Sequence, residues 1–138
     1  MDANLNVLVA DDDSVSREIA LRVLKKMGIR ADVAANGLEA IHAMAEQIYG
    51  IVLMDIQMPI MDGIEASKII TKRWPKGPKI IVITDCVPNL YQELCFNAGA
   101  SEFIAKPVRL KELALAILRY SPPNAEQPPE LAFTGSGE

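Results

Sequence analysis

The sequence predicts an α/β fold in which five parallel strands alternate with five helices. Five short apolar runs recur along the chain, and the segments between them show helical spacing and helix-capping residues. The first, third and fourth runs are almost entirely aliphatic, which indicates central strands covered by helices on both faces. The second and fifth runs are weaker and are expected at the edges. The predicted strands are Leu5–Ala10, Ala31–Ala34, Ile51–Met54, Lys79–Ile83 and Phe103–Ala105.

The first helix should follow the first strand. Val15, Ile19, Val23 and Met27 recur every four residues, the spacing that aligns side chains along one face of a helix. Gly28 comes next, and glycine readily adopts the left-handed conformation that closes many helices. We therefore expect the helix to end at about this glycine.

Capping residues mark the next two helices. Asn36 is followed three positions later by Glu39, and Asp62 by Glu65. This is the pattern of a side chain that caps the start of a helix, with an acid in the first turn. Helices should therefore begin after Asn36 and after Asp62. The second of them should stop before Pro75, because proline lacks the N–H that would continue the helix.

The last two helices are predicted from their ends and from an apolar stripe. One should run from about Pro88 to Asn97 and stop at Gly99. We expect the apolar residues of Val87–Asn97 to belong to the core rather than to a binding groove. The other should run to about Tyr120, with one stripe formed by Leu110, Leu113, Ala114 and Ile117.

Composition divides the 138-residue chain into two parts. Residues 1–120 have the length and apolar content of a single domain. Beyond Tyr120, four of the nine prolines fall in a short polar stretch that ends Gly-Ser-Gly-Glu. Because such a stretch buries too little apolar surface to offset its ordering entropy, residues 121–138 are expected to form a disordered tail.

Charge and composition argue against several classes of function. The formal charge is −4 and the 14 basic residues are scattered, so no direct nucleic-acid partner is expected. The sequence shows neither a secretory signal nor an apolar run near the roughly 18–20 residues that span a bilayer, which predicts a cytoplasmic protein without membrane insertion. Cys86 and Cys95 suit reduced thiols rather than a disulfide framework. His42, the single histidine, is interpreted as a polar position on a helix.

Polar residues stand at the ends of four predicted strands. The first strand ends in Asp11–Asp13, the third in Asp55 and the fourth in Thr84, and Lys106 follows the fifth. In open parallel sheets, ligands bind beyond the carboxyl ends of the strands. We therefore expect these side chains to form one site.

Clustered carboxylates repel one another unless a proton or a cation compensates, and a hard divalent ion with oxygen ligands fits. Mg²⁺ is the expected cofactor. Asp12 and Asp55 are the candidate direct ligands, Asp11 would act through water, and the backbone carbonyl of Gln57 would complete the set.

An anion beside this metal would be bound by the remaining polar groups. Lys106 and Thr84 are placed to bind its oxygens. A carboxylate nucleophile, a metal, a lysine and a hydroxyl together describe a site for phosphoryl transfer to an aspartate. Asp55 is the predicted acceptor.

The motifs that carry these residues resemble those of a known family, the receiver domains of bacterial-type two-component systems. The resemblance spans roughly Asn6 to Tyr120, with four motifs in the same order. It implies a flavodoxin-like fold with strand order 2-1-3-4-5. The matching segments are Val9–Asp13, Met54–Gly63, Ile83–Thr84 and Ala105–Pro107.

The resemblance also implies a function. Asp55 would take a phosphoryl group, with Mg²⁺, from the histidine of a kinase or of a phosphotransfer protein. Such a chain is a phosphoacceptor module of a two-component system rather than an enzyme, with at most self-phosphorylation and slow autodephosphorylation, and it can belong to a free-standing response regulator or to a hybrid kinase.

A conformational switch is implied at two positions. Thr84 would move toward the phosphoryl group, and Phe103 would turn inward to fill the space. The face made by the fourth helix, fifth strand and fifth helix would change and bind a downstream protein. A homodimer that depends on phosphorylation is a further outcome that the resemblance allows.

Three positions are expected to modulate the site. Asp85 stands where the family usually has a small residue. It would either hinder phosphorylation by bulk and charge or point to solvent, and exposure is the favoured expectation. Gln57 and Cys86 occupy positions where the family tunes the lifetime of the phosphoryl group, in a direction that the sequence leaves open.

Other interpretations of these residues exist. Asp11-x-Asp13 also fits the nucleophile motif of haloacid-dehalogenase-like phosphatases, in which Asp11 would be the nucleophile. That alternative leaves Asp55 without a role and lacks an acidic pair after Lys106. A flavin carrier would need a glycine-rich phosphate loop where this chain has three aspartates. Asp13 alone is interpreted as a simple helix cap.

Overall fold

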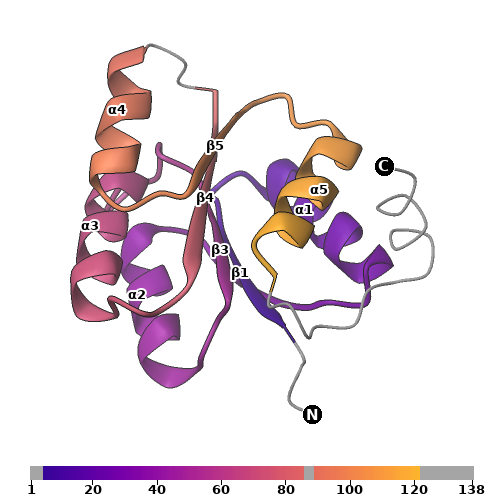
Figure 1. The fold of residues 1–138 in the computed structure, drawn as a ribbon, viewed down its shortest axis with the longest axis horizontal. Helices are drawn as coiled ribbons and strands as arrows, with labels where there is room; N and C mark the ends of the chain where they lie inside the picture. Colours follow the sequence, from indigo (N-terminus) through magenta and orange to yellow (C-terminus); the bar gives the residue numbers. More distant parts are fainter. Residues whose placement is uncertain (1–4, 86–88, 122–138) are drawn as a thin grey trace.

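A computed structural model describes residues 5–85 and 89–121. Its centre is a five-stranded parallel sheet of order β2-β1-β3-β4-β5, which confirms the predicted α/β fold, strand order and edge positions (Figure 1). The strands are β1 (Asn6–Ala10), β2 (Arg30–Ala34), β3 (Ile51–Met54), β4 (Lys79–Thr84) and β5 (Glu102–Ala105).

Helices cover both faces of the sheet (Figure 1). Helices α1 and α5 lie on one face, whereas α2, α3 and α4 lie on the other. The apolar strands fold this way because successive side chains of a strand point to opposite faces. In β1, Leu8 packs in the core under α2 and α3, and Val7 and Val9 pack in the core under α1 and α5. The helices are α1 (Ser14–Lys26), α2 (Gly37–Glu46), α3 (Gly63–Arg73), α4 (Asn89–Asn97) and α5 (Leu110–Arg119).

The predicted helix starts at the two capping residues are confirmed. Asn36 Oδ1 accepts a hydrogen bond from the Glu39 N–H at 2.9 Å, and Glu39 Oε1 accepts one from the Ala35 N–H at 2.8 Å. Asp62 Oδ1 accepts from the Glu65 N–H at 2.8 Å. These pairings satisfy N–H groups that have no partner inside the helix.

The helix ends agree with the predicted glycines. Gly28 has φ 73° and Gly99 has φ 110°, both in the left-handed region, and each lies two residues past the end of its helix, α1 and α4 respectively. Helix α3 ends at Arg73, before Pro75. The predicted start of α4 at Pro88 lies outside the described residues.

One prediction about α4 holds only for part of the helix, because Cys95 belongs to the core and Tyr91 packs against it. Its apolar residues were expected in the core, but Leu90 is 64% exposed and Phe96 is 47% exposed. Of its residues only Cys95 is buried. This short helix follows β4 and packs along the sheet on a narrow stripe, so an apolar side chain off that stripe remains in solvent.

Two expectations concern membrane insertion and the tail. In the described ranges, no helix combines the length and the hydropathy needed to cross a bilayer. The expected division at residue 120 and the expected disorder of the tail stay predictions, because residues 122–138 lie outside the described ranges.

Candidate functional site

The sheet brings the predicted residues to one edge. The Asp55 N–H donates to the Ala10 carbonyl at 3.0 Å, and the Lys106 N–H donates to the Thr84 carbonyl at 2.8 Å. These backbone bonds continue the pairing of neighbouring strands by one residue past their ends. The side chains at the ends of β1, β3, β4 and β5 therefore share one edge.

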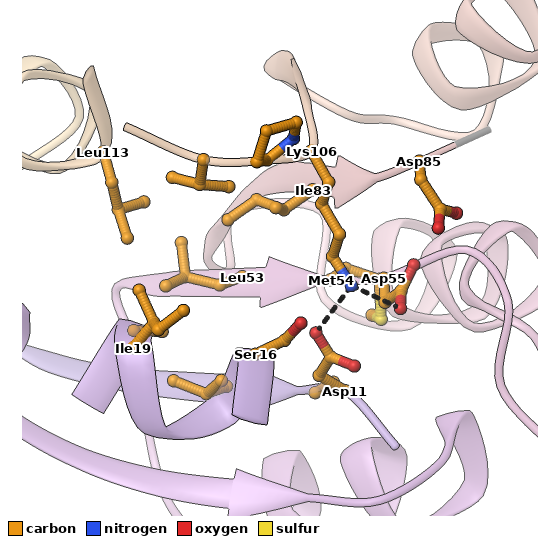
Figure 2. Close-up of a pocket in the computed structure, with 15 residues that line it drawn as sticks. Asp11, Ser16, Ile19, Leu53, Met54, Asp55, Ile83, Asp85, Lys106 and Leu113 are labelled. Carbon is orange, nitrogen blue, oxygen red and sulfur yellow. Dashed lines mark hydrogen bonds and ion pairs between the residues drawn. The ribbon is translucent and has the colours of Figure 1, made fainter. Parts of the chain in front are cut away.

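Lys106 joins the two buried aspartates. Its Nζ lies 3.2 Å from Asp11 Oδ2 and 3.2 Å from Asp55 Oδ2, and Figure 2 shows the side chain descending between them. Asp11 and Asp55 are each only 6% exposed. Because a buried carboxylate needs a compensating charge, one ammonium group stabilises both.

One lysine leaves the carboxylate charge incompletely balanced. Asp12 completes a cluster in which one oxygen from each of Asp11, Asp12 and Asp55 lies within 4.8 Å of the others. Three carboxylates and one ammonium group leave a formal charge of −2. Oxygen donors with this charge fit a hard divalent cation such as Mg²⁺.

Backbone groups and an arginine hold the carboxylates in place. The Asp13 N–H donates to Asp11 Oδ1 at 2.9 Å, and Arg17 Nη1 donates to the Asp11 carbonyl at 2.8 Å. The Gln57 N–H lies 3.4 Å from Asp55 Oδ1. Asp13 itself caps α1 by accepting from the Val15 N–H at 3.1 Å, as its sequence position predicts.

The pKa values of Asp11 and Lys106 are both raised. Burial raises the pKa of Asp11, and the nearby Asp55 charge adds to this, against the opposing effects of the Asp13 N–H and of Lys106. Burial lowers the pKa of Lys106, but the charges of Asp55 and Asp11 outweigh it and keep the ammonium form. The cluster is thus a set of like charges held together by one cation.

The loop between β3 and α3 approaches Asp55 closely. At Gly63, whose N–H donates to the Ile56 carbonyl at 2.8 Å, a Cβ would lie 2.0 Å from the Asp55 carbonyl oxygen. Only glycine fits there. Ile60, 78% exposed, has φ 72°, an unusual value for a β-branched residue, and the Met61 N–H closes a tight turn onto the Pro59 carbonyl at 2.7 Å.

The site opens into a pocket of about 370 Å³. Asp11, Asp55, Asp85 and Lys106 line its polar end, and apolar side chains of α1, the sheet and α5 line the rest (Figure 2). Asp85 is exposed, which agrees with the favoured expectation for this residue. In Figure 2 it lies on the Asp55 side of the pocket, far from Leu113.

The predicted switch residues are both in β-strands beside the site. Thr84, the last residue of β4, is fully buried. Phe103 in β5 is half-buried and packs against the core that α2, α3 and α4 cover. Cys86 lies outside the described residues. His42 is exposed on α2, as interpreted from the sequence.

Sequence reasoning missed Arg17. Its contact with the Asp11 carbonyl ties α1 to the site. The sequence did contain a signal, because Arg17 lies near the start of α1, whose first turn has no acid. The helix dipole favours acids at this end and disfavours a cation. A cation in this position therefore indicates that another interaction stabilises it.

The fold and site define a class, the doubly wound α/β proteins with a lysine-bridged acidic site at the carboxyl edge of the sheet. Residues 7–118 match the response regulator receiver domain, and the chain belongs to this family of two-component signalling modules. This confirms the resemblance seen in the sequence. It also disfavours the haloacid-dehalogenase-like alternative with Asp11 as nucleophile.

Known proteins agree with this membership. The chain is 36% identical over 121 residues to hybrid signal transduction histidine kinase K of Dictyostelium discoideum, covering 82% of this chain and 10% of that protein. The chain therefore spans about a tenth of the length of this relative.

Two solved structures are similar in fold and sequence. One is the receiver domain of Ssk1 of Saccharomyces cerevisiae in complex with the histidine phosphotransfer protein Ypd1, with 26% identity, TM-score 0.80, and coverage of 86% of this chain and 89% of that chain. The other is the CheX-CheY-BeF3-Mg²⁺ complex of Borrelia burgdorferi, with 27% identity, TM-score 0.79, and coverage of 83% and 87%.

Proposed function

We propose that Asp55 is the phosphoacceptor of this receiver domain. The observation that carries the proposal is the position of Lys106, whose ammonium lies 3.2 Å from both Asp55 and Asp11. A cation held there can stabilise negative charge that develops on an incoming phosphoryl group. Asp55 is the nucleophile because it comes from the central strand β3, with the other charged groups on either side of it.

Transfer proceeds from a phosphohistidine of a kinase or a phosphotransfer protein. A carboxylate oxygen of Asp55 forms a bond to phosphorus as the donor's P–N bond breaks, and the departing imidazole takes up a proton. Lys106 and Thr84 bind the phosphoryl oxygens. The Ssk1 receiver, bound to a histidine phosphotransfer protein, supports the class of donor.

The same residues provide the donor set for Mg²⁺. Asp12 and Asp55 would hold the ion directly, with Asp11 through water and the Gln57 carbonyl as further ligands. When bound, the ion neutralises the carboxylates and the phosphoryl oxygens. The residual −2 charge of the cluster and the similarity to a Mg²⁺-containing complex support this assignment.

Phosphorylation of Asp55 would change the shape of one face of the domain. Thr84 would move toward the phosphoryl group, Phe103 would turn further inward, and the α4-β5-α5 face would be reshaped for a downstream protein. Leu90 and Phe96 of α4 are exposed and give this helix apolar contact area. Phosphorylation-dependent dimerisation, slow autodephosphorylation and a cytoplasmic location remain part of the proposal.

Transfer from a phosphorylated histidine phosphotransfer protein tests the function. Wild-type protein should take the labelled phosphoryl group from the donor within the assay, and the Asp55→Asn variant should not. Asp13→Asn is the matched control, because it removes one aspartate charge nearby while asparagine preserves the helix cap. Equal loss of donor label with Asp55→Asn would refute the assignment.

Asp85 gives a second test of the site. If its carboxylate repels the incoming phosphoryl group, Asp85→Ala should accelerate labelling by acetyl phosphate severalfold. An unchanged rate would show that the exposed side chain leaves the entrance free, and that the residue does not control phosphorylation.

A further inference from the structure

A second concave surface lies beside the site, between α1 and α5. This α1–α5 groove has a volume of about 650 Å³, and Ile19 and Val108 line both it and the site pocket. Its apolar wall includes side chains that stay in solvent: Ile19 is 38% exposed and Leu115 is 38% exposed. Apolar surface that is concave and half-exposed is typical of a binding site.

The rim of the groove is basic. Arg22 and Lys26 on α1 and Lys111 on α5 line it and are exposed, and its described lining residues include no acid. This is notable because the whole chain has a formal charge of −4. The groove therefore selects an occupant that combines apolar side chains with negative charge.

The chain itself contains such a segment. Residues 122–138 begin three positions after the end of α5 and contain Glu126, Glu130 and Glu138, but no lysine, arginine or histidine. Leu131 and Phe133 are its only large apolar residues, and Glu130 immediately precedes them. We propose that, in place of the disorder that its composition alone predicts, this C-terminal segment docks in the α1–α5 groove, with Leu131 and Phe133 against the apolar wall and the glutamates at the basic rim.

The distances allow this contact. The groove residues of α5 lie between Leu110 and Leu115, so at about 1.5 Å per residue they are roughly 9–17 Å back along the helix from Ser121. Leu131 follows Ser121 by ten residues. Four of these ten residues are prolines, and a Pro-rich segment reaches about 3.1 Å per residue, or about 31 Å in all, which is more than enough to span this distance.

Tethering strengthens a weak contact. A segment joined to its site by a short linker has a local concentration on the order of millimolar. A docked segment therefore needs little intrinsic affinity to occupy the groove most of the time. Because the groove adjoins the site pocket, the docked segment would hinder a protein donor but not a small phosphodonor, a consequence that rests on the proposed function.

Backbone ¹H–¹⁵N NMR spectra of the full chain test the docking without phosphorylation. The double substitution Leu131→Ala with Phe133→Ala should shift the amide signals of Ile19, Lys26 and Leu115, and leave those of Leu90 and Phe96 on α4 unchanged. Raising the salt concentration from about 50 mM to about 500 mM should shift the groove signals of the wild type toward their positions in the double variant, because salt screens the attraction between the glutamates and the basic rim.

The matched control is Thr134→Ala with Ser136→Ala, which alters the same segment without removing an apolar or charged group. It should leave the groove signals in place. Groove signals unchanged by the Leu131 and Phe133 substitutions would overturn the proposal. So would groove signals that change with protein concentration, because a second copy would then be the occupant.

The functional consequence is measured separately. The Leu131 and Phe133 double variant should accept phosphoryl groups from a histidine phosphotransfer protein severalfold faster than wild type, with an equal rate from acetyl phosphate. If the double variant and the wild type accept phosphoryl groups from the protein donor at equal rates, the docked segment does not hinder that donor. Failure of all labelling would instead refute the proposed function, and the NMR result would still decide whether the segment docks.

Discussion

At the scale of single residues, the central contact is the pair of ion pairs made by Lys106 with Asp11 and Asp55. The sequence placed all three residues at one edge of the sheet, because each follows a predicted strand. It did not predict that the lysine bridges both carboxylates. A lysine side chain has four rotatable bonds and often lies in water, so only the burial of the two aspartates fixes its position.

Tyr49 yields a prediction on the pH dependence of stability. Its Oη donates to Asp32 Oδ2 at 2.7 Å, and burial together with Asp32 raises its pKa to about 12. The unfolded tyrosine ionises near pH 10. The neutral form is therefore favoured in the folded state, so its contribution is complete below about pH 10 and is lost as the pH rises toward 12.

The measurement is urea unfolding of wild type and Tyr49→Phe at several pH values. Near pH 8 the variant should be less stable by about 2 kcal/mol, because one hydrogen bond to a charged group is lost. This difference should shrink between pH 10 and 12. A constant difference across that range would show that Tyr49 does not titrate as described.

At the scale of elements, the helix starts could be read from the sequence because a cap is a local interaction. Asn36 and Asp62 bond to N–H groups three residues away, and no distant part of the chain is needed. The exposed residues of α4 could not be predicted in this way. Whether Leu90 or Phe96 is covered depends on how a neighbouring helix packs, which apolar spacing does not contain.

The cap of α2 is testable by a substitution that removes its acceptor. Asn36→Ala should lower the free energy of unfolding by about 1 kcal/mol, because the Glu39 N–H loses its partner. Asn36→Asp, which keeps an acceptor oxygen, should lower it by much less. Urea unfolding gives both values, and an equal loss in the two variants would mean that the side chain contributes by packing and not as a cap.

At the scale of the whole molecule, the parallel sheet explains why a site exists at all. Residues as far apart in sequence as Asp11 and Lys106 meet because parallel strands bring all their carboxyl ends to one edge. The sequence pattern predicted a parallel sheet because its signals recur five times, whereas the strand order came from the family resemblance. The groove between α1 and α5 could not be predicted, since it arises from how the two helices pack on the sheet.

Mg²⁺ should stabilise the folded protein through the acidic cluster. If the dissociation constant is about 1 mM, about 10 mM Mg²⁺ should raise the free energy of unfolding by about 1.4 kcal/mol. Asp12→Asn should abolish most of this gain, and because Asp12 is exposed the fold should tolerate it. Thermal unfolding with and without Mg²⁺ measures the effect, and Asp13→Asn, which should respond like wild type, is the control.

The assignment of Asp55 is tested most directly by locating the acyl phosphate. Wild-type protein is incubated with Mg²⁺ and acetyl phosphate, and the modified residue is identified by mass spectrometry. The proposed function predicts a Mg²⁺-dependent label on Asp55 that is absent from Asp55→Asn. A label on Asp11, or one that persists in Asp55→Asn, would contradict it.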